Sequence, residues 1–231
     1  MIKAVFFDLY NTLVRYDPPR EEVQAAVLGG MGIEVRPEAL RYPLSRADDF
    51  WYRENARLPV SKRPPEERMS LYTDYQMIIL QGTGIEIGRE LAQQIGLKVY
   101  QVPTQVVLFD DVLPTIAELR GKGLTLGLIS NIDGRLWSRM QGLDLLSRLD
   151  VVATSRDVGV EKPAPKIFLT ALELAGVEAS QAIHVGDQYH SDVVGARGVG
   201  IKPVLLDRWG FYGEITDCPR IHSLTQVVEH L

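Results

Sequence analysis

The sequence predicts an α/β fold in which a doubly wound parallel sheet is interrupted by an inserted all-helical unit. Three observations lead to this prediction. Short apolar runs recur along the chain and end in polar residues, and segments with helical periodicity separate them, which is typical of βαβ units. A stretch of about ninety residues near the N-terminus has no convincing strand-like run and is punctuated by proline and glycine.

Five runs have the length and composition of strands that are buried on both faces. They are rich in Val, Ile, Phe and Leu and do not alternate cleanly between apolar and polar residues. This is the pattern expected when helices cover both faces of a parallel sheet. The predicted strands are Lys3–Asp8, Leu124–Ser130, Val151–Thr154, Ala182–Asp187 and Val204–Asp207.

Helices are predicted between these strands, at Asp111–Lys122, Gly134–Leu146 and Pro163–Gly176. The last of them has the clearest pattern, because Ile167, Ala171 and Leu174 fall on one face of a helix. Gly176 follows as a C-terminal stop, since glycine readily adopts the left-handed conformation that ends many helices.

The inserted region, residues 17–105, is predicted to hold the helices Pro18–Leu28, Pro37–Arg57, Pro65–Leu80 and Glu86–Tyr100. Within the third helix, Met69, Tyr72 and Ile79 share one face. We therefore expect an α/β core made of residues 1–16 and 106–231, split around a helical domain made of residues 17–105.

The composition is that of an ordinary globular protein. The chain has 231 residues, of which 45% are hydrophobic and 24% are charged, and this excludes collagen-like, low-complexity and strongly disordered classes. The formal net charge of −5 argues against nucleic acid or an anionic membrane as the main partner. We expect a small-molecule substrate, and a monomer or homodimer.

The chain carries no sign of a membrane or secreted protein. The apolar N-terminal run is interrupted by Asp8, which is typical of a buried strand and not of a signal peptide. No stretch approaches the roughly 18 uninterrupted apolar residues of a membrane helix. The single cysteine, Cys218, excludes an intramolecular disulfide. A cytoplasmic location is expected.

Reactive polar residues gather beyond the carboxyl ends of the predicted strands, where open α/β sheets bind their ligands. Each segment alone has an ordinary structural explanation, such as a helix cap, a turn or a solvated loop. Their order along the chain, with the helical insertion between the first two, indicates an active site. The four segments are Asp8–Thr12, Ser130–Asn131, Glu161–Pro163 and Gly186–Asp192.

This ordered set resembles the motifs of the haloacid dehalogenase (HAD) superfamily over essentially the whole chain. The family's first motif is an apolar strand ending in Asp (here FFDLYNTL), and its second is a strand ending in Ser or Thr (here LGLISN). The third is a Lys, often before Pro (EKPAP), and the fourth is an acidic pair of the form GDxxxxD (VGDQYHSD). The resemblance implies a hydrolase with a Rossmann-like core and a C1-type helical cap.

The resemblance also implies a catalytic nucleophile and a metal site. Asp8 would attack the substrate and form a covalent aspartyl intermediate. Mg²⁺ would be held by the Asp8 carboxylate, the backbone carbonyl of Tyr10 and Asp187, with Asp192 close by. Such a hard, oxygen-rich ligand set suits Mg²⁺, which would offset the repulsion between the nucleophile and a phosphate.

Other motif residues would bind and orient the substrate. Lys162 would offset charge on the nucleophile and the phosphate, and Ser130 would donate a hydrogen bond to a phosphoryl oxygen. Thr12 would help to position the nucleophile loop, and Asn131 would assist in substrate binding. In the helical region, Arg41 is the candidate for binding an acidic end of the substrate.

The sequence departs from the family's phosphatases at Tyr10. The family's phosphatases have a second Asp at this position, which protonates the leaving group and then activates water. A tyrosine, with an ordinary pKa of about 10, is a weak general base near neutrality, and losing one acid–base group costs roughly 10²–10⁴-fold in rate. The family's 2-haloacid dehalogenases also lack this Asp and commonly read DxYGT, because halide leaves without a proton. Tyr10 therefore favours dehalogenation.

The fourth motif favours the phosphatase. The dehalogenases need no metal and usually replace the acidic pair, whereas this chain keeps Asp187 and Asp192 and has Asn11 where they have Gly. The retained acids would repel Asp8 without a cation. The sequence therefore favours a Mg²⁺-dependent, phosphatase-like hydrolase of a small phosphorylated metabolite. A metal-independent 2-haloacid dehalogenase and a weakly catalytic phospho-ligand-binding or regulatory module are the alternatives. His184 is expected to be core filler.

Overall fold

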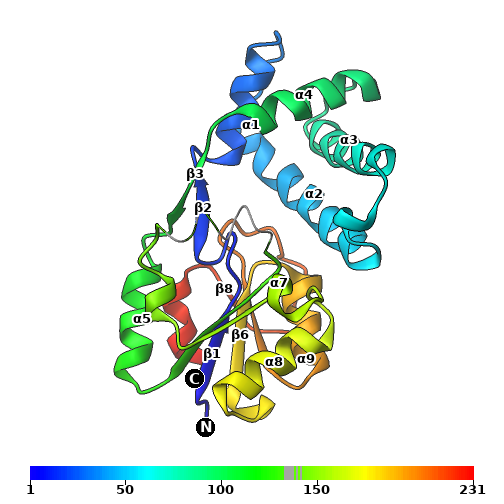
Figure 1. Cartoon of the computed structure of the whole chain (residues 1–231). Coiled ribbons are helices and arrows are strands. Elements are labelled where there is room, and N and C mark those ends of the chain that lie inside the picture. Colours follow the sequence, from blue (N-terminus) through cyan, green and yellow to red (C-terminus); the bar gives the residue numbers. More distant parts are fainter. Residues whose placement is uncertain (133–137, 139, 141) are drawn as a thin grey trace. The chain divides into compact units, whose positions relative to one another are not determined.

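The computed structural model describes residues 1–132, 138, 140 and 142–231 (Figure 1). The chain divides into two compact units: the first combines Met1–Arg15 with Val106–Leu231, and the second is Tyr16–Gln105. Tyr16 thus falls in the second unit, one residue before the expected boundary. Six of the thirteen residues of the predicted helix Gly134–Leu146 lie outside the described residues, and the prediction is wrong for residues 142–145, which form turns.

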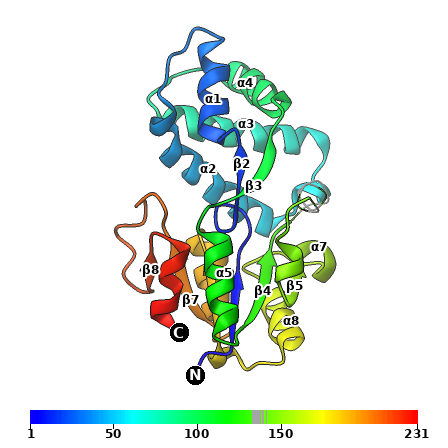
Figure 2. The same cartoon turned by 90° about the vertical axis from the view of Figure 1, so that its left-hand side faces the viewer.

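A six-stranded parallel sheet forms the centre of the first unit, so the predicted fold class is confirmed. The strand order is β5-β4-β1-β6-β7-β8, and every neighbouring pair runs parallel (Figure 2). The five predicted strands are present, and the sixth, β8, has only two residues. The strands are β1 (Ala4–Phe7), β4 (Thr125–Ser130), β5 (Val151–Thr154), β6 (Ala182–Gly186), β7 (Lys202–Leu206) and β8 (Arg220–Ile221).

Helices cover both faces of this sheet. Figure 1 shows α5 (Val112–Gly121) on one side and α8 (Pro165–Ala175) with α9 (Gly195–Gly198) on the other. The 3₁₀ segment η5 (Leu224–His230) packs against α5. The shorter segments are η2 (Leu146–Arg148), α7 (Ser155–Val158), η3 (Ala179–Gln181) and the π-helical η4 (Tyr189–Val194). The arrangement is therefore doubly wound.

Helix α8 supplies much of the core on its side of the sheet. Its buried residues are Ile167, Phe168, Ala171 and Leu172, which pack with Phe6 of β1 in one apolar cluster. The prediction that Leu174 shares this face is wrong, because its side chain is 59% exposed. The buried stripe is centred on the i, i+1, i+4, i+5 positions, and Leu174 lies beyond its edge.

The second unit is helical. Its helices are α1 (Arg20–Gly29), α2 (Pro37–Arg57), α3 (Pro65–Gly82) and α4 (Arg89–Gln101), with the short 3₁₀ segment η1 (Val60–Lys62) before α3. Strands β2 (Val14–Asp17) and β3 (Gln105–Leu108), where the chain passes between the units, pair in a two-stranded sheet. Proline occupies the first turn of α2 and of α3, where its missing N–H costs no helical hydrogen bond.

The four helices bury an apolar cluster of their own, which includes Leu28, Leu40, Ile79, Leu80 and Ile95. The predicted face of α3 is partly wrong, because Met69 and Tyr72 are 36% and 48% exposed while Ile79 is buried. No helix in the described part of the chain is long and apolar enough to cross a membrane.

A partly buried polar network also holds the helical unit together. The Arg20 guanidinium donates to both carboxylate oxygens of Asp48, at 2.9 and 2.6 Å, and the Tyr75 hydroxyl donates to Asp48 at 2.8 Å. Burial raises the pKa of Tyr75, and the Asp48 charge adds to this effect, so the phenol stays protonated. The hydrogen bonds satisfy groups that would be costly to bury alone.

Candidate active site

Parallel register brings three of the predicted site residues to one edge of the sheet. Strand β1 lies between β4 and β6, and Phe7 pairs with Leu128 on one side and Val185 on the other. The sheet order reverses beside β1, which is where doubly wound folds bind their ligands. Asp8 follows β1, Ser130 ends β4 and Asp187 follows β6, so their side chains leave the sheet at the same edge.

Three buried carboxylates converge at this edge. Asp8, Asp187 and Asp192 each offer an oxygen, and these oxygens lie within 4.8 Å of one another. Carboxylates this close repel each other unless a positive charge balances them. The cluster is therefore a candidate cation site, and its oxygen ligands are of the kind that Mg²⁺ prefers.

Lys162 provides one positive charge within the cluster. Its ammonium group donates to Oδ1 of Asp8 at 2.5 Å and to Oδ1 of Asp192 at 2.6 Å, and the whole side chain is buried. Burial alone would lower the pKa of Lys162, but the charges of Asp192 and Asp8 outweigh it and raise the pKa above its ordinary value. Lys162 therefore stays charged and bridges the two acids.

The pKa values of the two bridged acids, Asp8 and Asp192, are shifted in opposite directions. Burial raises the pKa of Asp8 above its ordinary value, against the opposing charge of Lys162. Burial also acts on Asp192, but Lys162 and a hydrogen bond from His184 outweigh it and hold the pKa of this carboxyl well below its usual range. Asp192 therefore stays ionised and is the anion that pairs with the charged Lys162.

Asp192 is held on every side. His184 Nε2 lies 2.9 Å from Oδ1, and the backbone N–H of Gln188 donates to Oδ2 at 3.0 Å. Gly186 makes room for it, because a Cβ at that position would lie 2.1 Å from the Asp192 Cγ. His184 was expected to be core filler, and it is buried, but it also belongs to the polar network of the site. Nothing in the local sequence distinguishes a buried histidine that packs from one that also bonds Asp192.

The loop after β1, residues 9–14, reaches Asp187 through Asn11. This residue has a φ of 60°, in the left-handed region that asparagine tolerates better than most residues. Its side-chain amide donates to Asp187 at 3.3 Å, and the Gln188 amide donates to the same oxygen at 3.0 Å. From the sequence, Asn11 is only a difference from the dehalogenase motif, because the motif does not indicate that its side chain contacts Asp187, 176 positions away.

The other two predicted residues of the loop are Tyr10 and Thr12. Tyr10 is partly exposed and forms an isolated β-bridge with Val14. Thr12 is fully buried, and its hydroxyl has no hydrogen-bond partner among the described residues. An unsatisfied hydroxyl in the loop after Asp8 is a group that a ligand could satisfy.

Ser130 ends β4, and Asn131 follows it. Ser130 is buried at the end of the strand. The Asn131 amide binds the backbone of Lys162 at both ends: its Oδ1 accepts from the Lys162 N–H at 2.7 Å, and its Nδ2 donates to the Lys162 carbonyl at 3.1 Å. Asn131 therefore fixes the chain that carries the bridging lysine.

Arg41 is the one predicted site residue that belongs to the helical unit. It lies on α2, its side chain is 40% exposed, and its Nε donates to Glu21 at 2.9 Å. Its guanidinium is thus already engaged within its own unit.

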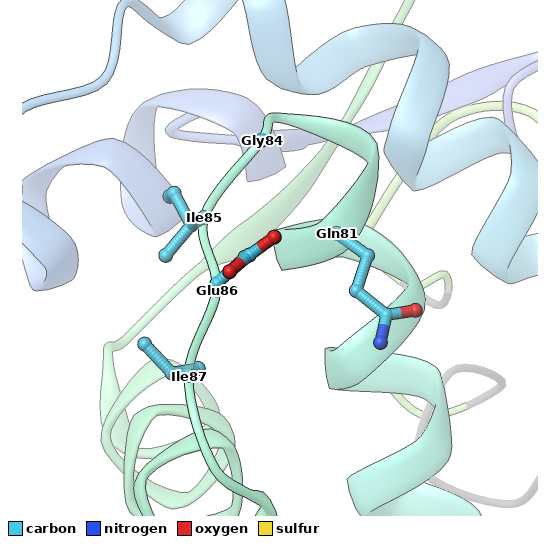
Figure 3. A pocket seen from close by; sticks show the side chains of 5 residues that line it. All are labelled: Gln81, Gly84, Ile85, Glu86 and Ile87. Atoms are coloured by element: carbon cyan, nitrogen blue, oxygen red, sulfur yellow. The ribbon is translucent and has the colours of Figure 1, made fainter.

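The helical unit also holds a pocket of about 420 Å³ beside the loop after α3 (Figure 3). The side chain of Glu86 points from this loop toward the helix that carries Gln81. The other lining residues are Gly84, Ile85 and Ile87. None of the five belongs to the four motifs, so the candidate active site remains the carboxylate cluster at the sheet edge.

Several known proteins are similar to this chain in sequence. Residues 2–200 match the model of the haloacid dehalogenase-like hydrolases. The chain is 32% identical over 206 residues to haloacid dehalogenase-like hydrolase domain-containing protein 3 of Homo sapiens, covering 89% of this chain and 82% of that protein. It is 29% identical over 225 residues to the glyceraldehyde 3-phosphate phosphatase of Methanothermobacter thermautotrophicus, covering 96% and 91%.

A solved structure extends the comparison to the fold. The 2-haloacid dehalogenase of Pseudomonas syringae pv. Tomato DC3000 is 29% identical and superposes with a TM-score of 0.56, covering 99% of this chain and 97% of that one. The names of these relatives include both a phosphatase and a dehalogenase. With the family model matching most of its length, the chain is a hydrolase and belongs to the haloacid dehalogenase-like hydrolase family.

Proposed function

We propose that this hydrolase is a Mg²⁺-dependent phosphatase that acts on a small phosphorylated metabolite. The observation that carries the proposal is the buried cluster of Asp8, Asp187 and Asp192. Lys162 adds one positive charge to these three acids, which leaves the group net negative. Because buried negative charge is costly without a counter-charge, this excess favours a site that binds a cation over a site that works without a metal.

The residues present fit Mg²⁺. Asp8 and Asp187 would hold the ion together with the backbone carbonyl of Tyr10, and Asp192 would support the site. The Asp192 Oδ1 already faces two donors, Lys162 and His184, and its Oδ2 accepts from the Gln188 N–H, so only one lone pair of Oδ2 is left for a further partner. When bound, the ion would neutralise the substrate phosphate and favour its approach to the anionic nucleophile.

The chain's own residues divide the remaining work. Asp8 is the nucleophile, and its carboxylate attacks phosphorus to form an aspartyl-phosphate while the bond to the leaving-group oxygen breaks and that oxygen departs as an anion. Water then hydrolyses the aspartyl-phosphate, which releases phosphate and restores the Asp8 carboxylate. Lys162, held between Asp8 and Asp192, stabilises negative charge on the transferred phosphoryl group. Ser130 donates to a phosphoryl oxygen, and the buried Thr12 hydroxyl, which has no partner among the described residues, donates to the ligand.

Tyr10 occupies the position from which the family's phosphatases protonate the leaving group. A phenol is a poor proton shuttle at neutral pH, so this chemistry suits substrates whose leaving group needs little protonation. A phosphate with an acidic leaving group, such as an acyl or enol phosphate, meets this requirement better than a sugar phosphate does.

We also propose that the helical unit is the family's C1-type cap and that it sets substrate specificity. Arg41 remains the candidate for an acidic end of the substrate. Because its Nε is bound to Glu21, the guanidinium would serve Glu21 and the substrate together. An arginine has five donors, so this double use is possible.

A metal-independent 2-haloacid dehalogenase is the second candidate, and Tyr10 is the observation that favours it. A halide leaves without a proton, so the missing acid would not matter in that reaction. The dehalogenase from P. syringae, at 29% identity, supports keeping this candidate in the test.

One assay matrix tests the proposal. The purified protein is incubated with p-nitrophenyl phosphate and a panel of phosphate monoesters, each with Mg²⁺ or with EDTA, and with L-2-chloropropionate in parallel. Phosphate release that needs Mg²⁺ and is lost in Asp8→Asn supports the phosphatase. Chloride release that EDTA does not affect overturns it. Binding of phosphate esters without turnover of any substrate would identify a binding or regulatory module instead.

A further inference from the structure

Arg208 lies outside all four motifs, two residues after β7, yet its side chain is only 11% exposed. Its guanidinium uses four of its five N–H donors on three residues. So many fixed contacts from one side chain indicate a defined structural task.

One edge of the guanidinium binds the nucleophile loop. Nε donates to the backbone carbonyl of Asn11 at 3.2 Å, and Nη2 donates to the carbonyl of Thr12 at 2.8 Å. These are consecutive carbonyls of the segment that follows Asp8. Binding both of them fixes the peptide plane between Asn11 and Thr12 and therefore the direction of the chain at this point.

The other edge is anchored to Asp111. Nη1 and Nη2 donate to its two carboxylate oxygens at 2.7 and 3.0 Å, in a bidentate pair. Asp111 is itself held by the Ser223 hydroxyl at 3.0 Å and the Leu224 N–H at 2.8 Å, at the start of η5. The guanidinium also lies over the Phe109 ring, 4.0 Å from its centroid.

These contacts join the chain segment just before β2 to the segment just after β3. Asn11 and Thr12 precede β2, while Phe109 and Asp111 follow β3. The Phe109 N–H also donates to the Leu13 carbonyl at 3.1 Å, so the two segments are in direct contact beside Arg208. Arg208 is thus positioned to set the conformation of the loop from a rigid base.

The loop needs such support because Asn11 has a positive φ. In this conformation the Asn11 amide reaches Asp187, which links the loop to the carboxylate cluster. A lysine at 208 could not replace the arginine, because a single ammonium cannot span two carbonyls and both oxygens of Asp111 in one plane.

We infer that Arg208 is a positioning residue, which clamps the nucleophile loop to Asp111 and so holds Asp8 and Asn11 in their working orientation. This role deepens the proposed phosphatase function and rests on it for its catalytic consequence. Its structural part, the clamp on residues 9–14, is independent of the substrate.

The test compares Arg208→Gln and Arg208→Lys with the wild type. Arg120→Gln is the matched control, because Arg120 pairs with Asp150 on the surface at 2.9 Å, away from the motifs. Amide hydrogen exchange is followed on peptides covering residues 9–14, where the N–H groups of Asn11, Leu13 and Val14 donate within the loop. Steady-state kinetics with p-nitrophenyl phosphate and thermal unfolding are measured on the same samples.

We expect exchange in this segment to rise about tenfold or more in Arg208→Gln, by less in Arg208→Lys, and not in Arg120→Gln. The value of kcat falls about tenfold or more while KM changes less than about threefold, because the clamp orients the nucleophile and does not bind substrate. A residue that only stabilises the fold would lower Tm and leave kcat unchanged well below Tm.

Unchanged exchange over residues 9–14 in the glutamine variant overturns the clamp, and altered exchange with unchanged kcat overturns its role in the reaction. If Arg208→Gln does not fold, Arg208→Lys decides in the same way, since it keeps the charge opposite Asp111. A wild-type protein that hydrolyses no phosphate ester contradicts the proposed function, and the exchange data still decide the clamp.

Discussion

Replacing Gly186 by alanine places a methyl group where the Asp192 carboxyl group lies. The new Cβ would stand 2.1 Å from the Asp192 Cγ, 2.3 Å from Oδ2 and 2.6 Å from Cβ. Because carbon atoms pack at about 3.5 Å or more, Asp192 must move by more than about 1 Å. Its side chain is buried and bonded to Lys162, His184 and the Gln188 N–H, so it cannot move without breaking these contacts.

The cost follows from these contacts. Overpacking a core costs roughly 1–3 kcal/mol, and losing a hydrogen bond to a charged group costs roughly 1.5–3 kcal/mol. We expect the free energy of unfolding of Gly186→Ala to fall by about 3 kcal/mol or more, which lowers Tm by about 6–12 °C in a protein of this size. Activity should fall at least about a hundredfold, because Lys162 loses its anchor.

Thermal unfolding and steady-state kinetics measure both effects. Gly198→Ala is the control, since nothing lies within 4 Å of a Cβ at that position, and we expect it to match the wild type. If Gly186→Ala keeps the wild-type Tm and kcat, the packing of Asp192 against Gly186 does not hold the site together, and the reasoning is refuted.

Three further predictions follow from other contacts of the site. Asn131→Ala removes both hydrogen bonds to the Lys162 backbone, so the free energy of unfolding should fall by about 2 kcal/mol and kcat should fall with it. An unchanged kcat would show that Asn131 does not position Lys162. Tyr10→Asp supplies the missing acid and should raise kcat for alkyl phosphates by up to roughly 10²–10⁴-fold, whereas an unchanged rate in a folded variant would show that protonation is not limiting. Mg²⁺ at about 100 times its Kd should stabilise the wild type by about 2.7 kcal/mol, seen as a higher Tm that Asp187→Asn abolishes; equal shifts in both proteins would place the ion elsewhere.

The fold was largely predictable because its strands are buried on both faces. Such strands appear as continuous apolar runs, and three of the five predicted runs end in a motif residue: Lys3–Asp8, Leu124–Ser130 and Ala182–Asp187. Strand β8, Arg220–Ile221, is too short to show any pattern. The helix faces were less predictable, because Leu174 and Tyr72 fit a helical period yet lie outside the buried stripe.

The site was predictable to the extent that its residues follow strands. Asp8, Ser130 and Asp187 meet because parallel register aligns the strand ends. The residues that orient them were missed for a different reason. His184 and Arg208 act through hydrogen bonds to partners that are specified only by the folded chain, and Arg208 lies 197 positions from Asn11 in the sequence.

The central claim is that Asp8 takes the phosphoryl group from the substrate. The most direct measurement is mass spectrometry of the protein quenched in acid during turnover of a phosphate monoester in the presence of Mg²⁺. We predict a phosphoryl group on the peptide that contains Asp8, which is absent from Asp8→Asn and from samples that contain EDTA. Turnover without this adduct, or with the phosphoryl group on another residue, would contradict the account.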